Sequence, residues 1–194
     1  MSILKYYSEL AKAIKLVSVK DGSGREIGLV DGADKAVELI LQAKEQGRKL
    51  IFIGNGASAA ISSHQSADYS KNGGVRAITF SDPALLTCMG NDFGYEHVFE
   101  KPVNIFADPR DLLVAISSSG KSANIINAAK AATQKKCEII TLSGFEINNP
   151  LSGMGILNFY VPVREYSHIE IIHHSICHYI LEMIIERNRL EDKA

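Results

Sequence analysis

A histidine and an aspartate are the first residues in this chain whose types and spacing could do chemistry. His64 and Asp68 are four residues apart within a helical pattern over 58–70, so we expect both side chains on one face of a helix. The helix is expected to start at a glycine-rich turn, which places the pair roughly 9–15 Å from that turn at 1.5 Å per residue. A solvated His–Asp pair on an amphipathic helix is the simpler alternative. The position beside the turn favours a functional role.

The last long helical pattern, over 167–188, carries a second group of this kind. Glu170, His174 and His178 follow one another at intervals of four, so they share a face. We expect Glu170 and His178 to act at a site and leave the role of His174 undecided. The other two histidines of this segment are expected at the surface or in a subunit interface: His168 and His173.

The two groups together offer two imidazoles and two carboxylates: His64, Asp68, Glu170 and His178. Imidazole titrates near neutral pH and a carboxylate can abstract a proton, so the set suits general acid–base catalysis. The same residue types can hold a divalent metal such as zinc. The residues alone leave both uses open.

Two glycine- and serine-rich turns predict an anion site. The first follows an apolar run over 50–53 and reads Gly54-Asn55-Gly56-Ala57-Ser58. The second follows an apolar run over 112–116 and reads Ser117-Ser118-Ser119-Gly120-Lys121-Ser122. Each turn is expected to open a helix, whose first N–H groups are unpaired and attract anions. Small residues let the backbone approach a phosphate, so we expect a phosphate-bearing ligand.

Strand-like and helical segments alternate along the chain, which is typical of an α/β fold. We expect a doubly wound, five-stranded parallel sheet flanked by helices, with ligands beyond the carboxyl ends of the strands. The expected strands are 49–53, 76–80, 112–117, 138–142 and 157–161. The expected helices are 33–46, 58–70, 94–106, 122–135 and 167–188.

An extra amphipathic helix is expected at the N-terminus, from apolar residues at helical spacing between Ile3 and Val17. Residues 20–25 read as a flexible turn that separates this helix from the main body. We therefore expect an N-terminal element over 1–32 and a phosphate-binding domain over 33–194. The N-terminal helix packs either on its own domain or on another subunit, and the second option, an oligomerisation element, is favoured.

Composition narrows the function classes. The 194 residues carry a formal net charge of −1, which gives no electrostatic reason to expect nucleic acid or membrane as a partner. No apolar run reaches the length of a membrane span, and charged residues interrupt the N-terminal segment, which argues against a signal peptide. Three widely spaced cysteines in apolar contexts indicate reduced, mostly buried thiols, so a cytoplasmic location is expected.

The chain resembles the sugar isomerase (SIS) domain family, and within it the phosphoheptose isomerase branch. The resemblance covers about 33–186 and rests on both turns, the terminal histidine helix and the segment Cys88-Met89-Gly90-Asn91-Asp92-Phe93-Gly94. It implies an aldose–ketose isomerase that converts sedoheptulose 7-phosphate to D-glycero-D-manno-heptose 7-phosphate, at the entry to heptose for bacterial lipopolysaccharide or capsule. It also implies a homotetramer with active sites at subunit interfaces.

The resemblance also assigns roles. Asp68 would be the base and His178 the opposing acid in an enediol mechanism that requires no nucleotide cofactor. In some members the positions of His64, Asp68, Glu170 and His178 bind zinc. Residues expected to contact the phosphorylated sugar are Asn55, Gly56, Ser58, Asp92, Ser117, Ser118, Ser119, Ser122 and Glu170.

The sequence departs from the family pattern at four positions. Asp68 replaces a glutamate, Glu170 a glutamine, Ser167 an aspartate and Ala57 a glycine. These changes bear on the exact sugar more than on proton transfer. A non-catalytic SIS-domain sensor of sugar phosphates, or a protein that binds a replication initiator, is the alternative. A dinucleotide-dependent oxidoreductase is disfavoured, because the first turn lacks the third glycine of G-x-G-x-x-G.

Overall fold

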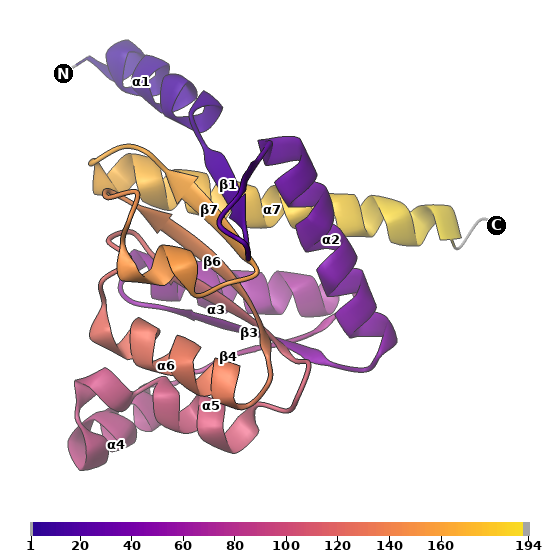
Figure 1. Cartoon of the computed structure of the whole chain (residues 1–194), viewed down its shortest axis with the longest axis vertical. Helices are drawn as coiled ribbons and strands as arrows, with labels where there is room; N and C mark the ends of the chain where they lie inside the picture. Colours follow the sequence, from indigo (N-terminus) through magenta and orange to yellow (C-terminus); the bar gives the residue numbers. More distant parts are fainter. Residues whose placement is uncertain (1, 192–194) are drawn as a thin grey trace.

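A computed structural model describes residues 2–191, so the outer ends of the two expected regions, 1 and 192–194, lie outside the described residues. Its centre is a seven-stranded sheet in the order β2-β1-β7-β6-β5-β3-β4 (Figure 1). The five expected parallel strands are confirmed within one or two residues. They are β3 (Lys49–Gly54), β4 (Arg76–Thr79), β5 (Leu112–Ser117), β6 (Glu138–Gly144) and β7 (Leu157–Val161).

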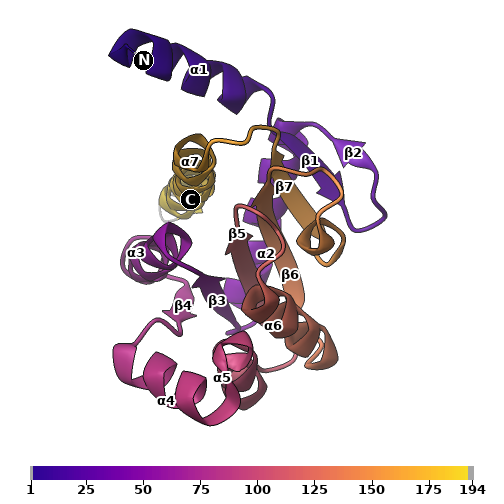
Figure 2. The same ribbon diagram turned by 90° about the vertical axis from the view of Figure 1, so that its left-hand side faces the viewer.

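Alternation along the strands divides the core between the two faces of the sheet. On β3, Leu50 and Phe52 join one apolar cluster, whereas Ile51 and Ile53 join the other. The first cluster is covered by α2 (Leu29–Glu45), α3 (Ala57–Lys71) and α7 (Tyr166–Glu191). The second is covered by α5 (Glu100–Phe106) and α6 (Ala123–Gln134), which lie on the opposite side of the sheet (Figure 2). The doubly wound fold is therefore confirmed.

The N-terminal segment differs from the expected flexible turn. After α1 (Ile3–Lys15), the strands β1 (Ser18–Asp21) and β2 (Glu26–Ile27) form a hairpin, and β1 pairs antiparallel with β7. The reason is that β7 would otherwise be an edge strand with unpaired backbone groups. Helix α1 extends away from the body (Figure 1) and exposes four large apolar side chains: Ile3, Leu4, Tyr7 and Ile14.

The segment after β4 holds a helix that we did not expect, α4 (Pro83–Phe93). The Asp82 side chain caps it by accepting a hydrogen bond from the Leu85 N–H at 2.9 Å. None of its residues, all of which are described, is buried, so the Cys88 thiol expected to be buried is exposed. The helix expected over 94–106 is split into η1 (Tyr95–His97) and α5, and a short η2 (Pro150–Gly153) precedes β7.

Two histidines of α7 expected at the surface or an interface are in the interior instead. His173 is fully buried, and its Nε2 donates to the Ser143 carbonyl oxygen at 3.2 Å. Burial lowers the pKa of His173 to about 4, so the side chain is neutral. His168 is also buried, against the ring of Tyr6 on α1. The prediction was wrong because α7 packs against the sheet and against three other helices, which buries most of its circumference.

Candidate functional site

The two glycine- and serine-rich turns meet at the carboxyl edge of the sheet. They do so because β3 and β5 are parallel neighbours, with Gly54 paired to Ile116. Between them lies a cavity of about 260 Å³, which we call the serine pocket. Its lining residues are Asn55, Gly56, Ala57, Ser58, Ile116, Ser117, Ser118, Ser119, Ser122, Tyr166 and Glu170. Every residue expected to contact the sugar phosphate is in this list except Asp92.

Two helices start at the serine pocket. The N-cap residue of α3 is Gly56 and that of α6 is Ser122, and within the described chain neither helix has a side-chain cap. The first N–H groups of both helices are therefore left for a ligand, and both helix dipoles place partial positive charge there. The Lys121 N–H already donates to Ser119 Oγ at 3.2 Å, which holds this hydroxyl in the turn. The arrangement suits a phosphate.

Glycine is required in the first turn for two separate reasons. Gly56 has φ of +54° and ψ of −123°, a conformation that other residues rarely adopt. A Cβ on Gly54 would lie 2.6 Å from backbone atoms of Ser58. The turn thus brings Ser58 against the end of β3, at the pocket floor.

An asparagine pair ties the two turns together. Asn55 Nδ2 donates to Asn124 Oδ1, and Asn124 Nδ2 donates to Asn55 Oδ1, both at 2.9 Å. The Tyr95 hydroxyl donates to the same Asn55 oxygen at 3.1 Å. Asn55 was expected to hold a sugar hydroxyl. In the structure its amide oxygen is already engaged by protein groups, which leaves one N–H of the amide for a ligand.

Asp92 lies outside the serine pocket, on the exposed helix α4. Its carboxylate accepts hydrogen bonds from Asn91 Nδ2 at 2.8 Å and from Cys88 Sγ at 3.7 Å. Tyr95, three residues later, reaches the pocket through Asn55. The structure therefore brings the end of this segment, but not Asp92 itself, to the site within one protomer.

Three imidazoles from two helices gather next to the serine pocket, and we call them the imidazole cluster: His64, His174 and His178. The ring of His64 lies 5.2 Å from that of His174 and 5.3 Å from that of His178, between centroids. Asp68 Oδ2 lies 3.1 Å from His64 Nε2. The structure thus brings Asp68 and His178 to the same place in one protomer, with His64 next to both.

His174, whose role the sequence left undecided, is at the centre of this group. Burial lowers its pKa, and the neighbouring His178 and His64 lower it further, while Asp68 acts in the opposite direction. Its Nε2 is buried and has no hydrogen-bond partner in the described part of the chain. A neutral imidazole with a free nitrogen can accept a proton or bind a metal ion.

Glu170 belongs to the serine pocket rather than to the imidazole cluster. It lies one helical turn before His174 on the same face of α7. One nitrogen from each cluster histidine lies within 4.8 Å of the others. The residues of the cluster therefore fit a divalent metal by type and spacing, with His174 in a place that the sequence had given to Glu170.

Comparisons with known proteins show the family of the chain. Residues 29–144 match the family model described as SIS domain. A phosphoheptose isomerase of Sodalis glossinidius is 37% identical over 186 residues, which cover 93% of each chain. That of Hamiltonella defensa is 34% identical over 171 residues, covering 85% of this chain and 82% of the relative. This chain belongs to the phosphoheptose isomerase branch of the SIS domain family. It is therefore an isomerase.

The similarity to this branch extends to the fold. The structure of a phosphoheptose isomerase from Neisseria gonorrhoeae matches with a TM-score of 0.80 and 31% identity, covering 94% of this chain and 96% of that one. One from Francisella tularensis matches with a TM-score of 0.82 and 25% identity, covering 95% and 96%. The SIS domain architecture described above is thus shared along nearly the whole chain.

Sequence reasoning missed three residues of this SIS domain site. Tyr166, the first residue of α7, lines the serine pocket. Asn124 and Tyr95 hold Asn55. Asn124 follows the second turn directly, so an anchoring role could have been inferred from its place; Tyr95 and Tyr166 follow no pattern that predicts their contacts.

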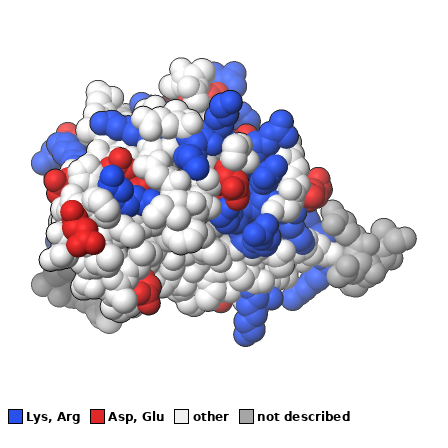
Figure 3. All heavy atoms as spheres, turned by 90° about the horizontal axis from the view of Figure 1, so that it is seen from below, with Lys and Arg blue, Asp and Glu red and all other residues white. Residues whose placement is uncertain are grey.

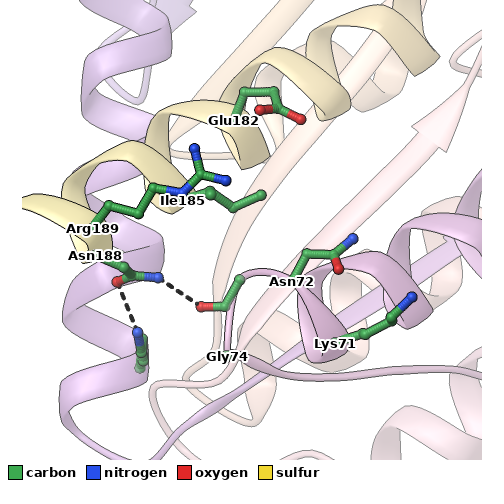
Figure 4. Close-up of a pocket in the computed structure, with 9 residues that line it drawn as sticks. Lys71, Asn72, Gly74, Glu182, Ile185, Asn188 and Arg189 are labelled. Carbon is green, nitrogen blue, oxygen red and sulfur yellow. Dashed lines mark hydrogen bonds between the residues drawn. The ribbon is translucent and has the colours of Figure 1, made fainter. Parts of the chain in front are cut away.

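A larger cavity, of about 720 Å³, lies at the other end of α7, and none of the serine-pocket residues lines it. Its cations Lys44, Lys71 and Arg189 lie in the last turns of α2, α3 and α7, where they complement the helix dipoles (Figure 4). Asn188 accepts from Lys44 Nζ at 2.9 Å and donates to the Gly73 carbonyl oxygen at 3.1 Å, which anchors the end of α7. Lys and Arg also gather on the face seen in Figure 3.

Within residues 2–191, every helix is too short or too polar to cross a membrane.

Proposed function

We propose that this protein is an aldose–ketose isomerase of a phosphorylated sugar, sedoheptulose 7-phosphate or a close variant, which it converts to D-glycero-D-manno-heptose 7-phosphate. One observation carries the proposal: α7 presents Glu170 to the serine pocket and His178 to the imidazole cluster on one face. Their separation of eight positions corresponds to about 12 Å along the helix axis. A sugar phosphate of that length, bound by its phosphate in the pocket, reaches the cluster with its carbonyl end.

The residues of the cluster support proton transfer between two neighbouring carbons. Asp68 takes the proton from the carbon beside the carbonyl group, and His178 protonates the carbonyl oxygen, which gives an enediol. Asp68 then returns its proton to the former carbonyl carbon, and His178 takes the proton of the other enediol hydroxyl, which becomes the new carbonyl group and completes the isomerisation. His64, 3.1 Å from the Asp68 carboxylate, orients this base. No redox cofactor is needed, because the electrons move within the sugar.

A zinc ion is part of the proposal. The sequence-based set is His64, Asp68, Glu170 and His178, and the structure supports the two histidines with Asp68 beside them. When bound, zinc would act as a Lewis acid on the sugar oxygens. Asp68 is one methylene shorter than the glutamate of the family, which shifts the carboxylate by about 1 Å and restricts which carbon it can reach.

We further propose a cytoplasmic homotetramer that serves lipopolysaccharide or capsule heptose synthesis. The exposed apolar residues of α1 support the assembly, as does an apolar groove of about 250 Å³ beside it that is lined by Ile14, Val30 and Tyr179. The exposed position of Asp92 on α4 fits a contribution to the site of a neighbouring subunit. No nucleotide, nucleic acid or membrane is required.

The experiment that tests the proposal follows C5 to C7 ketose phosphates by NMR in deuterated water. We expect turnover with deuterium incorporation at the carbon beside the carbonyl group. Asp68→Asn and His178→Ala should abolish turnover while inorganic phosphate still raises the melting temperature. Binding of sugar phosphates without deuterium incorporation in the parent protein would instead identify a sensor.

A further inference from the structure

The imidazole cluster contains one histidine more than the sequence-based ligand set, and it lacks Glu170. We infer that His174 is a metal ligand, so that a divalent transition metal is held by three imidazoles, those of His64, His174 and His178. The inference rests on the proposed function, because it concerns the carbonyl end of the same site. His174 takes the place of Glu170 as a ligand, and the Glu170 carboxylate remains part of the serine pocket.

The two helices that cross at this place each offer one pair of side chains at a spacing of four. On α3 the pair is His64 and Asp68, and on α7 it is His174 and His178. The rings of the α7 pair lie 4.6 Å apart between centroids, and each lies next to the ring of His64. Two rigid elements therefore present three nitrogens toward one point.

The spacing of the nitrogens is that of an open metal site. One nitrogen of each histidine lies within 4.8 Å of the others. Zinc–nitrogen bonds of about 2.0–2.1 Å put ligand nitrogens of a tetrahedral site about 3.3 Å apart. Metal binding therefore requires the nitrogens to approach one another by about 1.5 Å or less, which is within the range of side-chain rotation about χ1 and χ2.

The hydrogen-bonding state of His174 also indicates a ligand. Its Nε2 is buried without a hydrogen-bond partner among the described residues, which is costly for a polar atom. The adjacent His173 also has one unpartnered nitrogen, Nδ1, but its ring is fully buried in the core and its Nε2 donates to the Ser143 carbonyl oxygen. Of two consecutive histidines, one is thus held inside the core, and the other lies beside two further imidazoles.

The charges around the cluster favour a cation of this kind. Asp68 is the carboxylate that lies against the cluster, and it would leave a bound divalent ion with one net positive charge toward the sugar. Imidazole ligands select zinc, cobalt or nickel over magnesium, which prefers oxygen. We therefore expect zinc, cobalt or nickel to bind to the cluster and magnesium not to bind.

Metal binding by the full chain, freed of metal with a chelator, tests the inference without any use of activity. We expect one Co²⁺ per chain with the intense visible absorption of a four-coordinate ion, and X-ray absorption of the Zn²⁺ form with three imidazoles. His174→Ala should weaken Co²⁺ binding at least about tenfold and reduce the imidazole count to two. Glu170→Gln, the matched change one turn earlier, should leave both readouts unchanged.

The opposite pattern overturns the inference: Glu170→Gln weakens Co²⁺ binding while His174→Ala does not. Failure of the parent protein to bind Co²⁺ or Zn²⁺ overturns it as well. If His174→Ala is unfolded by circular dichroism, His174→Asn gives the same comparison with a polar side chain. Turnover of sugar phosphates is measured separately, so a metal site with three imidazoles and no isomerase activity would reject the proposed function and leave the ligand assignment in place.

Discussion

Asn55, in the first helix-opening turn, and Asn124, the second residue of α6, exchange two side-chain hydrogen bonds of 2.9 Å. Asn124 is almost fully buried and also accepts from the Ile125 N–H through the same oxygen. The pair fixes the distance between the two helix N-termini on which a phosphate would rest. It is a positioning device, because it holds the turns that carry the donors.

Asn124→Ala should therefore separate the two turns. We expect the free energy of unfolding to fall by about 1–3 kcal/mol, since a buried pair of hydrogen bonds is lost. The KM for the sugar phosphate should rise more than kcat falls. Asn127→Ala is the control: this side chain is on the same helix but donates to the Glu96 carbonyl oxygen. It should change neither KM nor kcat. Equal effects of the two variants would contradict the role given to the pair.

Gly32 on α2 tests how tightly the N-terminal hairpin is packed. A Cβ at this position would lie 2.6 Å from a methyl carbon of Val19, which is fully buried on β1. Alanine favours a helix over glycine by about 1 kcal/mol, but the overlap should outweigh this, so we expect Gly32→Ala to lose about 1–3 kcal/mol in chemical unfolding.

The matched control for this change is Gly90, which is also inside a helix. A Cβ there meets Val98 at an ordinary 3.6 Å. Gly90→Ala should therefore raise the free energy of unfolding by up to about 1 kcal/mol. Stabilisation by both substitutions would show that the hairpin is not docked on α2.

Glu170 places a carboxylate in a pocket built for an anion. Its removal in Glu170→Gln should lower the KM for a sugar phosphate about fivefold at low salt, because a like charge a few Å away costs about 1 kcal/mol in water. The effect should shrink as salt is added. Glu182→Gln, three turns later on α7 and outside the pocket, should leave KM unchanged; a KM that rises in Glu170→Gln would show that the carboxylate holds the sugar instead.

His173 makes stability depend on pH in a defined direction. Its pKa is lowered by burial to about 4 in the folded state, against 6.5 for the ordinary side chain, so unfolding takes up a proton between these values. The contribution of His173 is fully present above pH 6.5 and is lost as the pH falls to about 4, up to about 3 kcal/mol. His173→Gln keeps a donor for Ser143 and should flatten this decline in urea unfolding with a chelator present. Identical slopes for both proteins would contradict the assignment.

The elements that could be predicted from the sequence are those whose periodicity is set by burial on the sheet. The five parallel strands are apolar on both faces, and each is punctuated by a turn, so their positions and the edge at which ligands bind followed directly. The hairpin of β1 and β2 could not be predicted in the same way. Its strands are short, and the segment is polar and rich in glycine. The hairpin is ordered by pairing with β7, which is far away in the sequence.

The candidate site was predictable to a similar extent. The serine pocket could be predicted because its serine hydroxyls and helix N–H groups lie within the two short turns themselves. Helix α4 was missed because none of its described residues is buried. Hydrophobic periodicity detects a helix only when one of its faces is buried. His174 could not be assigned because its role depends on His64, more than one hundred residues away, and on how α3 and α7 cross.

The long helix α7 carries Glu170 at one end of the site and His178 at the other. The hydrogen bonds of Asn188 anchor its C-terminal end. The length of the site is therefore set by the rise per residue of α7 and not by the conformation of a loop. In the proposed binding mode a short phosphorylated ketose, such as a triose, would not span it, so we expect selection by chain length before any hydroxyl is recognised.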